Sequence, residues 1–530
     1  MELSALLHEL HLGPAYSSET PRPSASPPPI TELLSVLREK LIGPSSDSET
    51  SSLVSRVERL FQMADPHWLF LANQDGGWAE LRAEYVSVVC ALIGCAALPL
   101  CDDDCSSLPA AAYQSVPSRA VAVSSALAAL LRTLGNGGGQ SGVLHAVAPP
   151  VCVFAITHLQ VQPWSSSSSR AAAHSLQEEL LRAGGWRDSP HLLLGDGRQE
   201  EQQQEEEQQE EQQEKQQEEQ GRKGILGGVL DVLQPQLTKD SWQRCESVKL
   251  VFAWTLLQVT RPSLSPHLSR LLPPSLLLND HYRPENCMLG VRCLHHIVLN
   301  TTAADLRQFN RAEVVYQALF KHLYSTEPAV IQLVLSCLLD VLLVLETPPS
   351  SLGPSSSRRK SCRHDDVLRL VLTHMEAENK VALRRVYAAA LPPYVDRMGV
   401  AVCRHLRRLQ RVLLGYLEVS DPPEETSRLK ILQVLQKTCR AAWPRMESRV
   451  DMLLCCLLKL LVSVSSDRQL SETVRQMLMD QTSLCLKLLD GCCHGDIQRV
   501  LQQVDSSCCS PEVLRCLATV SGDVTAAGVS

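Results

Sequence analysis

Aromatic residues are scarce in this sequence: Phe, Trp and Tyr together make up 4% of its 530 residues, whereas hydrophobic residues as a whole reach 44%. β-Strands are usually signalled by aromatic and β-branched residues that alternate with polar ones. Such runs are few here, and leucine dominates the hydrophobic content. Leucine-rich segments with few aromatics favour helices, so we expect an all-α protein.

Motifs of catalysis and metal binding are also lacking. The sequence contains no C-x-x-C, no H-E-x-x-H, no nucleophile elbow and no kinase signature. The glycine-rich stretch GNGGGQSG (135–142) contains a G-x-G-x-x-G, but it follows a helical pattern, and neither a Lys-Ser/Thr pair nor a suitably placed acidic residue comes after it. We interpret it as a loop between helices. We therefore expect no catalytic residue, no cofactor, no metal ligand and no enzymatic activity.

A strong charge of either sign is lacking outside one segment. The formal net charge is −8, and residues 199–220 contain ten Glu and one Lys, which is −9 by itself. The remainder is then about +1, since −8 minus −9 is +1. A near-neutral folded part has no extended basic field for a phosphate backbone, so we expect no direct binding of nucleic acid.

Twenty cysteines would suit a disulfide scaffold in a short secreted chain, but here they are spread over a long one. The start, MELSALLHEL, lacks the features of a signal peptide. We expect reduced, mostly packed thiols in the cytoplasm or nucleus. We interpret CDDDC (101–105) as an exposed acidic loop. The longest apolar runs, 86–100, 330–345 and 452–464, are interrupted by proline or charge, so we expect no membrane span.

Three segments have compositions that cannot bury enough apolar area to fold: a Pro/Ser-rich stretch at 13–29, the Gln/Glu tract, and a Pro/Ser loop with a basic end at 347–361. They define the predicted domains. These are a mostly disordered N-terminus with one short helix (1–29), an N-terminal helical region (30–195), a Gln/Glu-rich linker (196–224), a C-terminal helical-repeat domain (225–520) that contains the Pro/Ser loop, and a disordered tail (521–530).

Helix-start signals recur through the C-terminal domain, in KDSWQRCESVKL, YRPENCMLGV, TEPAVIQLVL, EAENKVALRRV, SDPPEETSRLKIL and QLSETVRQML. Pro284, Pro328 and Pro422 mark a period of about 40–47 residues, which is typical of HEAT-type helical hairpins. Asp421 before Pro422 is expected to cap a helix whose first residue is the proline. The predicted fold is an α-solenoid of HEAT- or armadillo-like hairpins, interrupted by disordered linkers.

The stretch HYRPENCMLGVRCLHHIVLN (281–300) gathers three histidines and two cysteines. On a helix that begins at Pro284, Cys287 and Cys293 would lie about 120° apart and could not hold one ion together. Cys293 and His296 could share a face, but two ligands do not make a tetrahedral zinc site. We interpret the stretch as a packed helix.

Two features are candidates for function. VCRHLRRLQRVLLGYLEV (402–419) predicts a helix with a basic stripe, which we call the arginine stripe and which consists of Arg404, Arg407, Arg408 and Arg411. It could contact an acidic partner segment or a phosphate, or it could be a solvated face paired with the nearby Glu418, Asp421, Glu424 and Glu425. In SRRKSC, Ser361 follows three basic residues within the Pro/Ser loop, as in the sites of basophilic kinases, or belongs simply to a solvated loop.

Several segments carry a family resemblance: HYRPENCMLGVRCLHHIVLN, ADLRQFNRAEVVYQALFKHLY, RHLRRLQRVLLGYLEVSDPPEETSRLKIL and the later WPRM. Over about 280–445 the chain resembles the Tti-two family, the Tel-two-interacting proteins two, which are subunits of the Triple-T (TTT) complex. The Gln/Glu tract matches nothing in that family and looks like an insertion.

The resemblance implies a non-enzymatic helical-repeat scaffold. It implies assembly with Tel-two and Tel-two-interacting protein one, as an adaptor for the Hsp-ninety chaperone. The clients would be phosphatidylinositol-3-kinase-related kinases such as mTOR, ATM and ATR, which links the complex to the DNA-damage response and nutrient signalling. A helical-repeat protein for transport or nucleic-acid binding, or an enzyme with an unrecognised site, are the alternatives.

Overall fold

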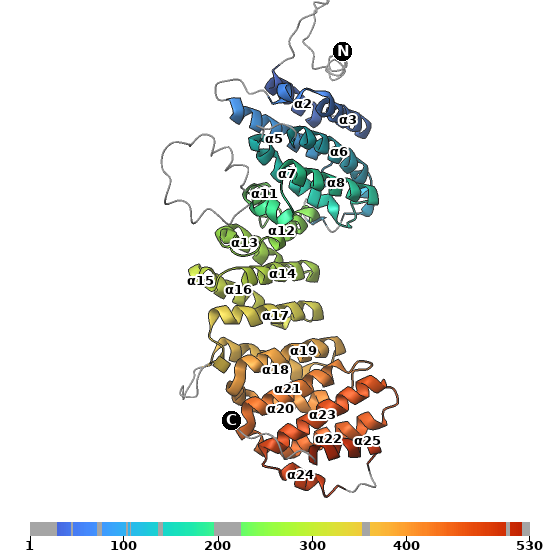
Figure 1. Cartoon of the computed structure of the whole chain (residues 1–530), viewed down its shortest axis with the longest axis vertical. Helices are drawn as coiled ribbons and strands as arrows, with labels where there is room; N and C mark the ends of the chain where they lie inside the picture. The colour runs from blue at the N-terminus through green and yellow to red at the C-terminus, as the bar shows by residue number, and fades with distance from the viewer. Residues whose placement is uncertain are drawn as a thin grey trace, which may run out of the picture. The chain divides into compact units, whose positions relative to one another are not determined.

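The computed structural model describes residues 29–43, 46–70, 77–101, 104–105, 108–135, 141–195, 224–351, 361–504 and 509–521. Every regular element in these ranges is an α-helix or a 3-10 helix (Figure 1). The prediction of an all-α fold is thereby confirmed. Contacts divide the chain into two compact units, Met1–Pro274 and Ser275–Ser530.

The first unit packs its helices in two layers (Figure 1). In one layer α2 packs on α5, α5 on α7, and α7 on α11 and α12; in the other, α3 packs on α6 and α6 on α8. The α-helices are α2 (Ile30–Ile42), α3 (Asp47–Met63), α4 (Pro66–Leu69), α5 (Gly77–Cys95), α6 (Val116–Gly135), α7 (Ser141–Leu159), α8 (Ser167–Ala183), α9 (Ser189–Leu194), α11 (Leu226–Leu233) and α12 (Glu246–Gln258).

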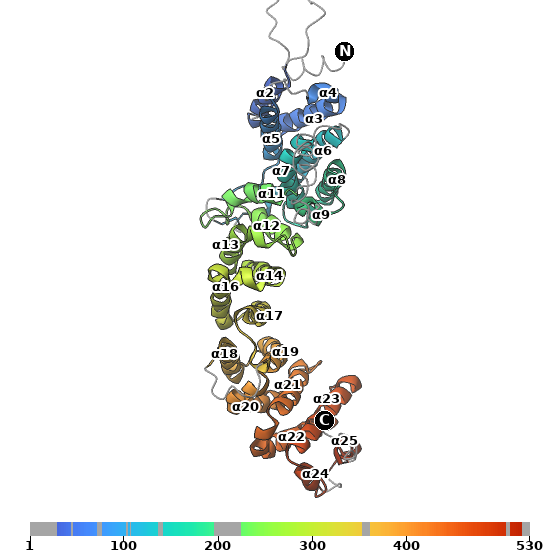
Figure 2. The same cartoon turned by 60° about the vertical axis from the view of Figure 1, so that its left-hand side comes forward.

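The second unit repeats this arrangement (Figure 2). In one layer α14, α17, α19, α21 and α23 pack each on the next, and in the other α18 packs on α20 and α20 on α22. The helix α13 (Leu268–Asn279) crosses the division between the units. The remaining α-helices are α14 (Pro284–Asn300), α15 (Ala303–Arg307), α16 (Arg311–Phe320), α17 (Pro328–Leu345), α18 (Arg363–Ala377), α19 (Val381–Met398), α20 (Leu406–Glu418), α21 (Thr426–Ala442), α22 (Val450–Ser466), α23 (Glu472–Cys492), α24 (Asp496–Leu501) and α25 (Pro511–Ser521).

The predicted period is present in the structure. The second helices of successive repeats begin at residues 246, 284, 328, 381, 426 and 472, so consecutive starts are 38, 44, 53, 45 and 46 residues apart. The longest step contains the Pro/Ser loop. α16–α17, α18–α19, α20–α21 and α22–α23 are antiparallel hairpins, each joined by a short connection. The predicted HEAT-like solenoid is confirmed within the second unit.

Polar spacing explains how these helices pack. On α17 the four-residue series Gln332, Ser336 and Asp340 faces outward or lies half-buried, whereas Leu335 and Leu338 are fully buried. A helix covered by neighbours on several sides keeps only such a narrow polar stripe. Each hairpin therefore buries most of its leucine and valine surface between the two layers.

Two helices, α7 and α17, are long and apolar enough to cross a bilayer by composition. Both lie in the packed layers: α7 contacts α5, α8, α11 and α12, and α17 contacts α14, α16 and α19. The core helices of an all-α protein pass the same compositional test, so this observation is no evidence for membrane insertion.

The Gln/Glu tract belongs to residues 196–223, and the two described segments that flank this range lie side by side. The backbone N–H of Ile225 donates to the carbonyl of Leu192 at 3.1 Å, and α11 packs on α7 and α9. Residues 224–274 thus belong to the first compact unit. The division between units lies inside α13, not at the tract where the sequence placed a linker.

Local expectations differ from the structure at two further places. α21 begins at Thr426 with Glu425 before it, so Asp421 does not cap a helix that starts at Pro422. In CDDDC, Cys105 is buried rather than exposed, and its thiol donates to Glu246 Oε2 of α12 at 3.5 Å. The backbone N–H of Cys105 donates to the carbonyl of Gln243, and that of Cys101 donates to the carbonyl of Arg244. The predicted short helix in 1–29 and the tail lie outside the described residues.

Candidate functional site

The arginine stripe does not lie on one helix. Residues 399–405 form a 3-10 helix and α20 follows from Leu406, so Arg404 precedes the α-helix that carries Arg407, Arg408 and Arg411. The opposite face is buried as predicted, and it consists of Val402, Leu406, Leu409, Leu413 and Tyr416. The stripe therefore faces away from this buried side of α20.

Three of the four stripe arginines form ion pairs or hydrogen bonds with other residues of this chain. Arg404 Nη1 lies 2.8 Å from Asp365 Oδ2, and Arg411 Nη2 lies 3.1 Å from Glu376 Oε1. Arg408 Nη1 donates to Thr373 Oγ1 at 2.9 Å, and its Nε lies 3.7 Å from the same Glu376 oxygen. Arg407 is exposed and pairs with no described residue. Its charge is the part of the stripe that remains available to solvent or a partner.

The acidic residues after α20 have other partners than the stripe. Asp421 and Glu424 bind Arg385 on α19, at 3.1 and 3.2 Å, and Glu425 pairs with Arg428 at 3.4 Å. The predicted pairing of the stripe with residues 418–425 is therefore wrong. Stripe arginines reach back to α18 in the preceding hairpin, because α18 and α20 are neighbours in one layer.

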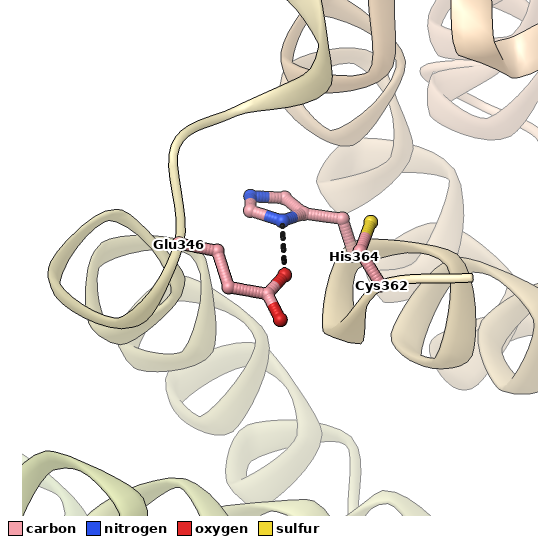
Figure 3. Close-up of side chains that lie close together, drawn as sticks. All are labelled: Glu346, Cys362 and His364. Atoms are coloured by element: carbon pink, nitrogen blue, oxygen red, sulfur yellow. Dashed lines mark ion pairs between the residues drawn. The ribbon is translucent and has the colours of Figure 1, made fainter. Parts of the chain in front are cut away.

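A cluster of three chemically different ligand groups lies where α17 ends and α18 begins. We call it the Glu346–Cys362–His364 cluster; one ligand atom of each residue lies within 4.8 Å of the others (Figure 3). Glu346 follows the last residue of α17, and Cys362 is the residue before α18. The Glu346 carboxylate approaches the imidazole edge of His364, with Oε2 at 3.4 Å from Nδ1.

Charged neighbours surround the cluster. Arg363 Nη1 donates to Glu346 Oε1 at 2.8 Å, its backbone N–H donates to Oε2 at 3.0 Å, and its Nη2 lies 2.8 Å from Glu313 Oε2. Asp365 accepts from the Cys362 backbone and thiol, at 3.1 and 3.3 Å, and from His405 Nε2 at 2.8 Å. The cluster is thus held by a network that also reaches Arg404 of the stripe.

Burial shifts the pKa values of the side chains in and beside the cluster. It lowers the pKa of His364 from its ordinary value, partly opposed by the nearby negative charge of Glu346, so burial favours the neutral imidazole. Burial likewise raises the pKa of the Cys362 thiol. For Asp365, burial would raise the pKa, but hydrogen bonds from His405 and Cys362 and the charge of Arg404 make the net shift downward.

Sequence inspection missed this cluster. Glu346 and Cys362 are separated by the Pro/Ser loop, so no fixed motif spacing joins them. The sequence offered one indication of the cluster, namely that Glu346 and Cys362 directly flank the Pro/Ser loop. Ser361, the predicted phosphorylation site, is exposed and lies immediately before Cys362.

The histidine- and cysteine-rich stretch 281–300 forms α14 from Pro284, as predicted. Cys287 and Cys293 are buried, and burial raises the pKa of Cys287 to about 11 and of Cys293 to about 12. Cys287 Sγ lies 3.7 Å from Nδ1 of His322, not near the other thiol of its own helix. These thiols are protonated packing groups near neutral pH.

Comparison with known proteins shows which family this chain is similar to. The model of the Tti2 family matches residues 151–422. TELO2-interacting protein 2 of Homo sapiens is 44% identical over 366 residues, which cover 69% of this chain and 67% of the human protein. The chain belongs to the Tti2 family.

Other relatives extend the comparison. TELO2-interacting protein 2 of Mus musculus is 41% identical over 382 residues, covering 72% of this chain and 70% of the mouse protein. An uncharacterized protein of Arabidopsis thaliana is 25% identical over 193 residues, 36% of this chain and 41% of the plant protein. Among solved structures, Kap95p with RanGDP aligns at a TM-score of 0.45 and 13% identity, covering 92% of this chain and 67% of Kap95p.

The Tti2 match includes the whole candidate site. Glu346, Cys362, His364 and the four stripe arginines all lie within 151–422. It also extends further toward the N-terminus than the resemblance seen at 280–445: it begins within α7 and covers α8 to α12 of the first unit. The Gln/Glu tract lies inside the matched range.

Proposed function

We propose that this chain is a non-enzymatic scaffold subunit of a TTT complex that binds a TELO2 (Tel-two) protein. Membership of the Tti2 family carries this proposal, since its relatives are named TELO2-interacting protein 2. The partner set would also include Tel-two-interacting protein one. Stacked hairpins offer a partner a large surface built from many helices, so binding energy can be distributed over several repeats.

The wider role follows from that assembly. The complex would act as an Hsp-ninety co-chaperone adaptor that supports the maturation and stability of phosphatidylinositol-3-kinase-related kinases. Through these clients it would support the DNA-damage response and mTOR signalling. Cytoplasmic and nuclear sites of action are both part of this proposal. The subunit's own contribution would be to hold a partner in a stable shape.

Affinity purification tests the proposal. Tagged full-length protein is purified gently from cells, treated with nuclease, and analysed by quantitative mass spectrometry. Near-stoichiometric TELO2 and Tel-two-interacting protein one, with kinases and chaperone at lower levels, would support it. Loss of the recovered partners on nuclease treatment would favour the nucleic-acid-binding alternative, and recovery of neither named partner would overturn the assignment.

The arginine stripe can be tested as part of the interface. Arg407→Glu reverses the one stripe charge that pairs with no described residue, so its effect does not pass through Asp365 or Glu376. If the stripe contacts an acidic partner, recovery of that partner falls with Arg407→Glu. The matched control is Arg468→Glu, another exposed arginine in the second unit. Equal recovery from the two variants would remove the stripe from the interface.

Ser361 is proposed as a phosphorylation site. Its exposed side chain lies just before α18, where a phosphate would benefit from the helix dipole and from the nearby Arg363. Phosphopeptide mapping of the protein isolated from cells, with Ser361→Ala as the reference, checks this. Absence of a modified peptide spanning Ser361 under kinase-activating and resting conditions would contradict it.

A further inference from the structure

We propose that Glu346, Cys362 and His364 form a binding site for a transition-metal ion of the zinc class. The site lies between the end of α17 and the start of α18 (Figure 3). This proposal is independent of the TTT assignment, because it depends on the chemistry of three side chains and on no partner.

His364 is the first observation that points to a ligand. Its side chain is 1% exposed, and neither ring nitrogen makes a hydrogen bond with the residues that the structure describes. Nδ1 faces the Glu346 carboxylate at 3.4 Å without the geometry of a hydrogen bond. Buried polar atoms are nearly always satisfied, so a buried imidazole with two unused nitrogens requires an explanation. A metal ion bound at Nδ1 would supply one of the two missing interactions.

The set of donor atoms is the second observation that points to a metal ion. One imidazole nitrogen, one thiol sulfur and one carboxylate oxygen converge, and this N/S/O mixture suits Zn²⁺ better than Ca²⁺ or Mg²⁺, which take oxygen ligands. Zinc bonds of about 2.0–2.3 Å set ligand atoms roughly 3.4–3.6 Å apart in a tetrahedron. The three ligand atoms lie within 4.8 Å of one another. Binding of the ion would therefore have to draw them closer, by rotation of the Glu346 and Cys362 side chains. Three protein ligands leave the fourth position for water.

The neighbours of the cluster provide the outer support that metal ligands usually have. Arg363 holds both oxygens of Glu346, Oε1 through Nη1 at 2.8 Å and Oε2 through its backbone N–H at 3.0 Å, and Oε2 also faces Nδ1 of His364 at 3.4 Å. The charge of Arg363 is also matched by Glu313. When the Zn–S bond forms, the Cys362 thiol loses its proton to solvent, so the thiolate and the Glu346 carboxylate balance the two charges of the ion.

The ion would join two helices across the Pro/Ser loop. Glu346 and Cys362 are the residues that directly flank 347–361, so a shared ion would fix the base of this loop. The hairpin step between α17 and α19, the longest in the second unit, would then be closed by metal coordination at its base.

Cobalt titration of the purified full-length protein tests the site, because Co²⁺ replaces Zn²⁺ and a thiolate bound to it gives a charge-transfer absorption band. Cys362→Ser removes the sulfur while placing a favoured capping residue before α18, so the variant is expected to fold. The control is Cys403→Ser, which removes a half-buried thiol outside the cluster. Circular dichroism and thermal unfolding verify the fold of each protein.

The expected result is one equivalent of Co²⁺ with a thiolate band in the wild type and in Cys403→Ser. Cys362→Ser should lose the band and bind at least about 100-fold more weakly, and Glu346→Gln should weaken binding with the band retained at saturation. Zn²⁺ should raise the unfolding midpoint of the wild type but not of Cys362→Ser. A band of equal strength in Cys362→Ser would assign the metal to other thiols and overturn the proposal, as would the absence of tight binding by the wild type.

Discussion

His158 lies near the end of α7, where its side chain is 1% exposed and its ring packs edge-on against Phe154 with centroids 4.8 Å apart. Burial lowers the pKa of this histidine to about 4. In the unfolded chain an ordinary histidine takes up a proton below about pH 6.5. The folded protein resists that protonation until the pH approaches 4, so unfolding binds a proton over the interval between these two values.

We therefore expect the free energy of unfolding to fall as the pH falls from 6.5 to 4, with about 3 kcal/mol of the loss due to His158. His158→Leu should remove this part of the pH dependence, measured by urea unfolding at half-unit pH steps. His174→Gln is the control, since His174 is mostly exposed beside Glu178. An unchanged slope in His158→Leu would show that His158 does not stay neutral in the fold.

Gly290 on α14 marks a close approach between two helices. A Cβ at this position would lie 2.1 Å from the backbone nitrogen and 2.5 Å from the Cα of Asn279 on α13. Gly415 on α20 has no atom within 4 Å of the corresponding point. Gly290 is therefore required for the close contact between the helices, whereas Gly415 is not required by any neighbour. The sequence shows both simply as isolated glycines inside helices.

Gly290→Ala is expected to destabilise the protein by about 3 kcal/mol, because backbone atoms cannot move aside as a flexible side chain can. Gly415→Ala should be neutral or stabilise by up to about 1 kcal/mol, since alanine is the better helix former. Chemical unfolding of both variants checks the pair. Similar effects at the two positions would contradict the tight contact between α13 and α14.

At the scale of elements, the sequence predicted helices well and their junctions less well. The recurring start signals placed α12, α14, α17, α19, α21 and α23, because leucine spacing and local propensity act within one helix. The entry into α21 was predicted four residues too early. Asp421 has the right identity for a cap, but its side chain binds Arg385 of the preceding hairpin and the backbone N–H of Ser427 at 3.0 Å. Such a contact between repeats is not visible in local sequence.

Asp421 and Glu424 allow this junction to be tested, because both pair with Arg385. The Asp421 side chain is 3% exposed and that of Glu424 is 61% exposed. We expect Asp421→Ala to destabilise by about 2 kcal/mol, since it leaves buried donors unsatisfied, and Glu424→Ala to change stability by less than about 0.5 kcal/mol. Thermal and urea unfolding distinguish them. Equal losses would mean that the junction depends on exposed charge rather than on the buried acceptor.

Sequence patterns within single helices could not predict the Glu346–Cys362–His364 cluster. Glu346 ends one helix, Cys362 and His364 begin another, and the distance between them along the chain is set by a loop of arbitrary length. Their proximity follows from the stacking of α17 against α19 and of α18 against α19. Repeat proteins bring such residues together through the packing of neighbouring hairpins, so a site at a junction becomes visible only in three dimensions.

At the scale of the whole molecule, composition indicated the fold class but misplaced the division of the chain. The Gln/Glu tract looked like a linker between domains because it interrupts the leucine pattern. Its flanks nevertheless meet: Ile225 bonds to Leu192, and a Cβ at Gly224 would lie 2.1 Å from the carbonyl oxygen of Leu193. The tract therefore connects two segments of one compact unit, and composition could not show where those segments lie.

Deletion of residues 199–220 tests this conclusion. It leaves six residues, 196–198 and 221–223, between Gly195 and Gly224, which are enough to connect ends already held together. Shortening the connection from 28 residues (196–223) to six lowers the entropic cost of closing this loop on folding. We therefore expect the free energy of unfolding to rise by about 1 kcal/mol. The tract contains no apolar residue whose loss could oppose this gain. Urea unfolding of the deletion variant and of the wild type measures the difference.

A matched variant separates length from composition. Replacement of 199–220 by a Gly/Ser segment of equal length keeps the loop entropy and removes the same net charge of −9, so its stability should equal that of the wild type. Both variants should also co-purify with the same partners as the wild type, because the flanking helices keep their packing. Destabilisation of both by more than about 1 kcal/mol would mean that the tract itself packs on the first unit and is part of its fold.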